Sequence, residues 1–190
     1  MATDSLTTDE RAFSIEEFER LPERDWRTEL VQGRLVREPL AGYEHGLLAN
    51  RISFLLTAFV REHRLGDVLT AETGFVLSED PPTVRGPDVA FVAAERVPTE
   101  GPPAGFARFA PDLAVEVVSP SSRLSEVQDK ALDYLDAGAR LVWVVEPRAR
   151  RVMVYRSRSD IRVLGLEEEL DGGSVLPGFR LPVREIFEAT

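Results

Sequence analysis

Residues 113–118 form a short apolar run with the alternation of a β-strand. Alternate side chains of a strand point to opposite faces, so Glu116 shares a face with Ala114 and Val118, and the other face is entirely apolar. A strand of this kind is usually covered on both sides. A carboxylate in that setting loses its hydration unless a cation or hydrogen-bond donors compensate. The pattern therefore predicts a buried strand whose carboxylate, Glu116, needs a partner.

Three helices are predicted, two of them from apolar residues at helical spacing. The longest spans about residues 44–65, and a second spans about residues 124–135. A shorter helix is predicted from Ser14 to about Pro22, because Ser14 and Glu17 have the spacing of a capping box. The buried stripes are expected at Leu48, Ile52, Leu55, Leu56 and Phe59 of the longest helix, and at Leu124, Val127, Ala131 and Leu135 of the second.

The other apolar runs predict strands. Hairpins are expected at residues 28–37 and 141–155, and single strands at about residues 67–77, 87–92 and 161–166. Residues 78–86 are expected to be a loop, and the proline-rich residues 97–111 an ordered surface loop.

These elements mix strands and helices without a regular βαβ repeat. They predict an α/β fold with a mixed central β-sheet flanked by helices. A chain of 190 residues is long enough for one domain with a substantial core. We expect that domain at residues 13–190, after a flexible N-terminal segment at residues 1–12.

Composition narrows the possible functions. The chain has no cysteine, which excludes disulfides and thiolate metal sites. Its formal net charge of -10 argues against broad affinity for nucleic acid, whose backbone is anionic. One arginine cluster could contact phosphates, or could simply be a solvated hairpin surface: Arg148, Arg150, Arg151, Arg156, Arg158 and Arg162. No apolar run reaches the roughly 20 residues of a membrane span, so we expect a cytoplasmic protein without a signal peptide.

Asp88 is a second acid in a setting like that of Glu116, because it opens the apolar run at residues 87–92. Two carboxylates at the ends of neighbouring strands repel each other unless a divalent cation lies between them. Oxygen ligands suit Mg²⁺ or Mn²⁺. The two acids therefore form a candidate metal site.

Lys130 is the only lysine in the chain. A role that arginine cannot supply would explain why a lysine stands here. The alternative is an exposed lysine that pairs with Glu126 or Asp133 of its own helix.

Glu44 and His45 lie in the first turn of the longest predicted helix. The helix dipole favours a carboxylate there, which is enough to explain Glu44. His45 is either a partly buried structural histidine or a contact for phosphate or a proton relay. Glu29 is expected on the surface of the first hairpin, with a role near the site as the alternative.

The order of Pro87-Asp88, Glu116 and Lys130 resembles the PD-(D/E)xK nuclease superfamily. The superfamily lysine usually stands two residues after the second acid, where this chain has Val118. In the Uma-type family of that superfamily the lysine comes from the following helix, and Lys130 matches it. Similarity to this family covers nearly the whole chain, at Glu29 to Gly33, Glu44-His45, Pro87-Asp88, Glu116 to Ser121, Lys130, Tyr134, Gly138, Trp143 and Leu176 to Phe179.

This resemblance implies a restriction-endonuclease-like fold that cleaves DNA with Mg²⁺ or Mn²⁺. Asp88, Glu116 and Lys130 would be the catalytic residues. Glu44 would join the metal ligands, because the first core helix of these enzymes often brings an acid to the metal. Nuclease folds of this size often pair to cut both strands, so the resemblance also implies a homodimer.

Three functions fit the sequence. The first is a metal-dependent DNA endonuclease, for which alanine at Asp88, Glu116 or Lys130 should abolish cleavage without lowering the melting temperature. The second is a non-catalytic interaction or regulatory module with the nuclease fold, which the acidic balance and the displaced lysine favour. The third is a metal-dependent hydrolase that acts on another substrate.

Overall fold

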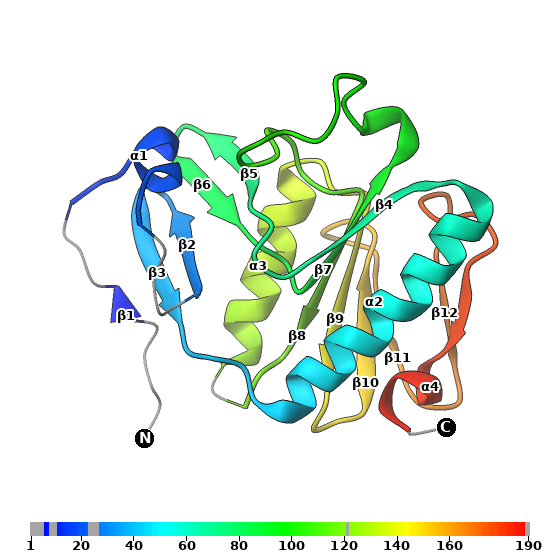
Figure 1. The fold of residues 1–190 in the computed structure, drawn as a ribbon. Coiled ribbons are helices and arrows are strands. Elements are labelled where there is room, and N and C mark those ends of the chain that lie inside the picture. Colours follow the sequence, from blue (N-terminus) through cyan, green and yellow to red (C-terminus); the bar gives the residue numbers. More distant parts are fainter. Residues whose placement is uncertain (1–5, 8–10, 23–26, 121, 189–190) are drawn as a thin grey trace.

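The computed structural model describes residues 6–7, 11–22, 27–120 and 122–188 (Figure 1). They form one α/β domain around a six-stranded mixed sheet with the strand order β11-β10-β9-β8-β7-β4. Its strands are β4 (Gly66–Thr70), β7 (Val89–Ala93), β8 (Leu113–Val117), β9 (Leu141–Glu146), β10 (Arg151–Tyr155) and β11 (Ile161–Leu164). The predicted α/β fold with a mixed central sheet is confirmed. Most of the expected flexible segment, residues 1–12, lies outside the described residues, and Leu6–Thr7 within it form the short strand β1.

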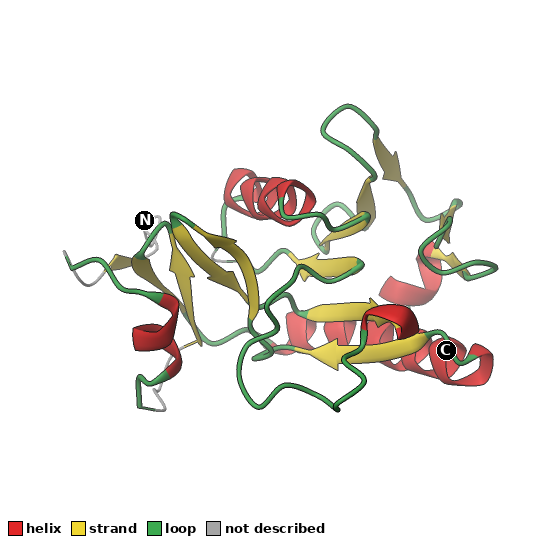
Figure 2. Ribbon diagram, turned by 90° about the horizontal axis from the view of Figure 1, so that it is seen from above, coloured by secondary structure: helices red, strands yellow, loops and turns green. Residues whose placement is uncertain are grey.

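Strand β8 lies inside this sheet, antiparallel to β7 and parallel to β9. Its alternation is the one that the sequence predicts. Leu113, Val115 and Val117 belong to the core beneath α2 (Tyr43–His63), while Ala114 packs in the core beneath α3 (Leu124–Asp136). The two helices therefore cover opposite faces of the sheet, and Figure 2 shows the resulting three layers. Glu116 faces the α3 side, because it lies two residues from Ala114.

The helices begin and end close to their predicted positions. α1 (Ile15–Glu19) has the capping box between Ser14 and Glu17, and α4 (Val183–Phe187) closes the described chain. In α3 the buried side chains are Val127, Ala131 and Tyr134, so Tyr134 takes the place expected for Leu124 and Leu135, which are only partly buried. A short hairpin of β12 (Glu169–Asp171) and β13 (Arg180–Pro182) precedes α4. Within the described ranges, no helix is both long and apolar enough to cross a bilayer.

The core beneath α2 gives a test of this packing. Ile52 is 0% exposed, whereas Phe54 on the same helix is 70% exposed. We expect Ile52→Ala to lower the free energy of unfolding by about 3 kcal/mol, because it removes buried methyl groups and leaves a cavity. Phe54→Ser should change it by less than about 0.5 kcal/mol. Urea denaturation of both variants measures the difference, and equal effects would contradict the packing described for α2.

A second, five-stranded sheet stands beside the first and was not predicted. Its order is β1-β3-β2-β6-β5, with β2 (Arg27–Val31), β3 (Arg34–Glu38), β5 (Phe75–Glu79) and β6 (Pro82–Arg85). The prediction of one strand at residues 67–77 is wrong, because a turn divides it into β4 and β5, which belong to different sheets. The expected loop at residues 78–86 contains β6.

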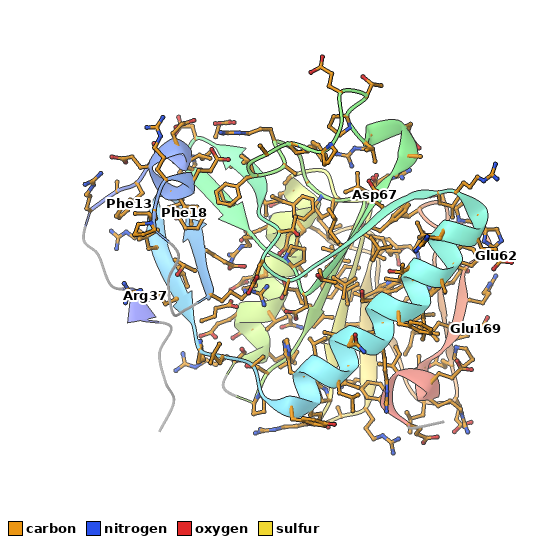
Figure 3. All side chains as sticks on the ribbon, viewed as in Figure 1. Phe13, Phe18, Arg37, Glu62, Asp67 and Glu169 are labelled. Carbon is orange, nitrogen blue, oxygen red and sulfur yellow. The ribbon has the colours of Figure 1, made fainter. Side chains whose placement is uncertain are left out.

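The turn between β4 and β5 has a physical cause. Glu72 has a φ of 80°, which a continuous strand does not allow. Just after this turn, a Cβ at Gly74 would lie 2.3 Å from Cδ1 of Phe106, so glycine lets the start of β5 lie against the loop that carries Phe106. The second sheet buries its own small core against α1, where Figure 3 shows Phe13 and Phe18 close together.

Candidate active site

Asp88 and Glu116 lie side by side at one end of the central sheet. Val89 of β7 pairs with Val115 of β8 in antiparallel register, so the residue before β7 meets the end of β8. The N–H of Val117 donates a hydrogen bond of 2.8 Å to Oδ2 of Asp88. Both acids are almost fully buried, at 3% and 4% exposed, and both line one cavity of about 910 Å³.

Asp88 is surrounded by donors and cations. Nη1 of Arg27 donates to Oδ1 at 2.7 Å, and Nε2 of His45 lies 3.1 Å from Oδ2. Burial acts to raise the pKa of Asp88, but the hydrogen bond from His45 and the charge of Arg27 outweigh it and lower the pKa to about 2. The pKa of His45 is raised, because its bond to Asp88 outweighs its burial. Asp88 is therefore ionised at neutral pH.

Glu116 has the opposite character. The hydroxyl of Tyr134 donates to Oε1 at 2.9 Å, and no other described residue donates a hydrogen bond to this carboxylate. Burial raises the pKa of Glu116 to about 7, the charge of Lys130 opposes this, and the charge of Asp88 adds to it. One carboxylate of the pair thus remains partly protonated at neutral pH when no further cation is near.

Lys130 extends from α3 into the same cavity, and its side chain is 11% exposed. Its Nζ forms an ion pair with Glu38 and lies 3.3 Å from Oε2 of Glu29. Burial acts to lower the pKa of Lys130, but the charges of Glu29, Glu116 and Glu38 outweigh it, and the pKa lies above its usual value. The alternative of an exposed lysine paired with a neighbour on its own helix is wrong.

The second sheet supplies charged residues around the cavity, of which the sequence analysis did not single out Arg27, Glu38 and Arg85, and considered Glu29 near the site only as the alternative. Arg27 and Glu29 lie on one face of β2, and Glu38 of β3 pairs with Arg27 across the hairpin. Glu29 is 2% exposed, which corrects the expectation of a surface residue, and it accepts a bond of 2.8 Å from Nη1 of Arg85. The signal in the sequence was the alternation of charged residues with Leu30, a buried residue of the opposite face.

The comparisons with known proteins agree with this architecture. Residues 15–184 match the model of the Uma2 family, described as putative restriction endonuclease. The chain belongs to the Uma2 family. A crystal structure of a putative nuclease belonging to DUF820 from Anabaena variabilis ATCC 29413 has a TM-score of 0.82 and 21% sequence identity, with 92% of this chain and 97% of that chain covered. This likeness shows the restriction-endonuclease-like fold, and no curated protein gives a significant match.

Two predicted site features of this Uma2 chain lie apart from the cavity of Asp88 and Glu116. Glu44 is exposed and lines a smaller cavity of about 180 Å³, which it shares with His45 and Arg148. The structure thus does not bring Glu44 together with the other two acids. Within the arginine cluster three side chains are engaged by carboxylates, in the pairs Arg150 with Glu188, Arg151 with Glu146, and Arg158 with Asp136.

The acidic side chains of the cavity are the candidate ligands for a metal ion. Among the described residues, no three histidine or acidic side chains are grouped closely enough to hold one. The carboxylates of Asp88 and Glu116 still face the same cavity. Two are enough, because Mg²⁺ is commonly bound through one or two carboxylates together with waters and substrate phosphates. Glu116 keeps one carboxylate oxygen without a hydrogen-bond donor from the described residues. Asp88 and Glu116 of this Uma2 chain therefore fit a hard divalent cation.

Proposed function

We propose that this protein is a divalent-metal-dependent endonuclease that hydrolyses phosphodiester bonds of DNA. The observation that carries the proposal is the convergence of Asp88, Glu116 and Lys130 on one cavity. Membership of the Uma2 family, whose description is that of an endonuclease, supports the same reaction class. Further expectations are a cytoplasmic location and a homodimer that presents one site to each strand of a duplex.

Each residue has a role that follows from its contacts. Asp88 and Glu116 would hold Mg²⁺ or Mn²⁺, which supplies an activated water and neutralises charge on the phosphate. Lys130 would donate to a phosphate oxygen, where its positive charge stabilises the transition state. The hydroxyl of Tyr134 keeps Glu116 oriented, and His45 with Arg27 keeps Asp88 ionised.

Incubation of supercoiled plasmid with the purified protein tests this proposal. We expect nicking with Mg²⁺ or Mn²⁺, none with EDTA, and none by Asp88→Asn, which removes a charged ligand without changing the size of the side chain. Asp67→Asn, at an exposed acid of β4, is the matched control and should cut like the wild type. Equal cutting by Asp88→Asn, or cutting in EDTA, would contradict the proposal.

The competing function is a non-catalytic module with the nuclease fold. The net charge of -10 and the engagement of Lys130 by two carboxylates favour it. It predicts that the folded wild type cuts no DNA with either metal. Isothermal titration with Mn²⁺ would then show no binding at millimolar concentration.

A further inference from the structure

The ammonium group of Lys130 lies between two carboxylates that differ in burial. The side chain of Glu29 is 2% exposed, whereas the side chain of Glu38 is 25% exposed. Both residues come from the second sheet, on β2 and β3, and both reach across to α3. One partner of Lys130 is thus enclosed by protein, and the other is open to the cavity.

Glu29 is fixed in place from several sides. Nη1 of Arg85 donates to its Oε2 at 2.8 Å, and the N–H of Gly86 donates to its Oε1 at 3.2 Å. Arg85 is in turn held by Asp133 of α3, whose Oδ2 lies 2.8 Å from Nε. Although burial acts to raise the pKa of Glu29, the charges of Lys130 and Arg85 outweigh it and lower the pKa. Glu29 is thus held by two hydrogen-bond donors beside Lys130, and the neighbouring cations favour its ionised form.

Glu38 is held less firmly. It ends β3 and is followed by the exposed residues Pro39 and Leu40. Apart from Lys130, its partner is Nε of Arg27 at 3.6 Å. Glu38 also lines the cavity, so it can turn away from Lys130 without leaving a buried charge unpaired.

We propose that Glu29 is the positioning residue that holds Lys130 toward the cavity, and that Glu38 is an exchangeable partner whose place a phosphate oxygen of the substrate takes. This inference rests on the proposed function. A tetrahedral phosphate diester carries the same kind of anionic oxygen as Glu38. The ammonium group therefore exchanges one acceptor for another, while Glu29 keeps its position.

The other charged groups around Lys130 are consistent with this division. Glu116 of β8 adds a third negative charge to its surroundings, while Arg27 of β2 and Arg85 of β6 are the nearby cations. Tyr134, one turn further along α3, donates its hydroxyl to Glu116. None of these groups makes the direct contact with Nζ that Glu29 and Glu38 make.

Because Lys130 is the only lysine, lysine-selective isotope labelling gives one side-chain NMR signal. Its pKa can be measured in EDTA, independently of any cleavage. We expect Glu29→Gln to lower the pKa of Lys130 by about one unit or more and Glu29→Asp to restore part of it. Asp129→Asn, at an exposed acid beside Lys130, is the matched control and should leave the signal within about 0.3 units. An unchanged pKa in Glu29→Gln and Glu29→Asp would overturn the proposal.

Cleavage kinetics on a duplex oligonucleotide supply a second test of the proposal. Glu29→Gln should lower kcat by about 100-fold with little change in KM, and Glu29→Asp should recover part of that loss. Glu38→Gln should lower KM by about threefold or more, because phosphate no longer competes with a carboxylate. A raised KM in Glu38→Gln would overturn the exchange. A wild type that cuts nothing, with the pKa differences intact, would refute the proposed function and leave the positioning role of Glu29 standing.

Discussion

Glu116→Gln is expected to abolish cleavage and at the same time to make the fold more stable. Glutamine keeps the shape of the side chain and an oxygen that can accept the hydrogen bond from the hydroxyl of Tyr134. It cannot supply the negative charge that a divalent cation requires. We therefore expect kcat/KM for plasmid cleavage to fall by about 10³-fold or more.

The gain in stability follows from the raised pKa. The pKa of Glu116 is about 7 in the folded protein, against 4.5 for an ordinary glutamate. The free energy of unfolding of the wild type therefore falls as the pH rises from about 4.5 to about 7. In this range Glu116 is already ionised in the unfolded chain but still holds its proton in the folded protein. A neutral glutamine has nothing to ionise, so without metal the variant should be more stable by about 3 kcal/mol at pH 8.

Urea denaturation in EDTA at pH 5 and pH 8 measures this difference. The gain should be large at pH 8 and small at pH 5. Glu62→Gln, at an exposed glutamate of α2, makes the same substitution without burial and should show no such pH dependence. A Glu116→Gln variant that is less stable than the wild type at pH 8 would contradict the burial argument.

Lys130→Ala is expected to abolish cleavage and to destabilise the fold. The substitution leaves the buried Glu29 with Arg85 as its remaining close cation and deprives Glu38 of its main partner. Removing one member of a buried ion pair typically costs about 3 kcal/mol or more. The sequence alone predicted a melting temperature that is nearly unchanged or higher for alanine at Lys130, and the contacts with the second sheet are the reason for the revised expectation.

A double-mutant cycle measures this coupling. Glu29→Gln in the background of Lys130→Ala should cost less than in the wild type, because the carboxylate that it removes has already lost one of its two close cations and keeps only Arg85. Lys130→Arg, which keeps the charge, should retain most of the stability but not the activity, since guanidinium and ammonium differ in shape and hydration. Additive effects of the two single substitutions would show that Lys130 and Glu29 act independently.

The central sheet and its helices could be predicted because their signals are local. β8 has an apolar face and a face with one carboxylate, α2 has a regular buried stripe, and Ser14 with Glu17 marks the start of α1. Each of these patterns spans fewer than about 20 residues, and burial enforces it. The proximity of Asp88 and Glu116 followed from the same reasoning, since both stand at strand ends.

The second sheet and its charges could not be predicted because they depend on contacts between distant residues. Arg27 contacts Asp88, which lies 61 positions away in the sequence, and Glu38 contacts Lys130, which lies 92 positions away. In the sequence, Arg27 and Glu38 look like ordinary surface residues of a hairpin. Only the tertiary packing brings Arg27 to Asp88 and Glu38 to Lys130, and no local periodicity reports that packing.

The contact between the two sheets is apolar at one end and ionic at the other. At β5, Phe75 is fully buried against Ala90 and Val92 of the central sheet, whereas at β2 and β3 the contact consists of ion pairs. Separated ions recover their hydration in water, but separated apolar surfaces do not. Any widening of the cavity should therefore pivot about Phe75 and open at the charged side.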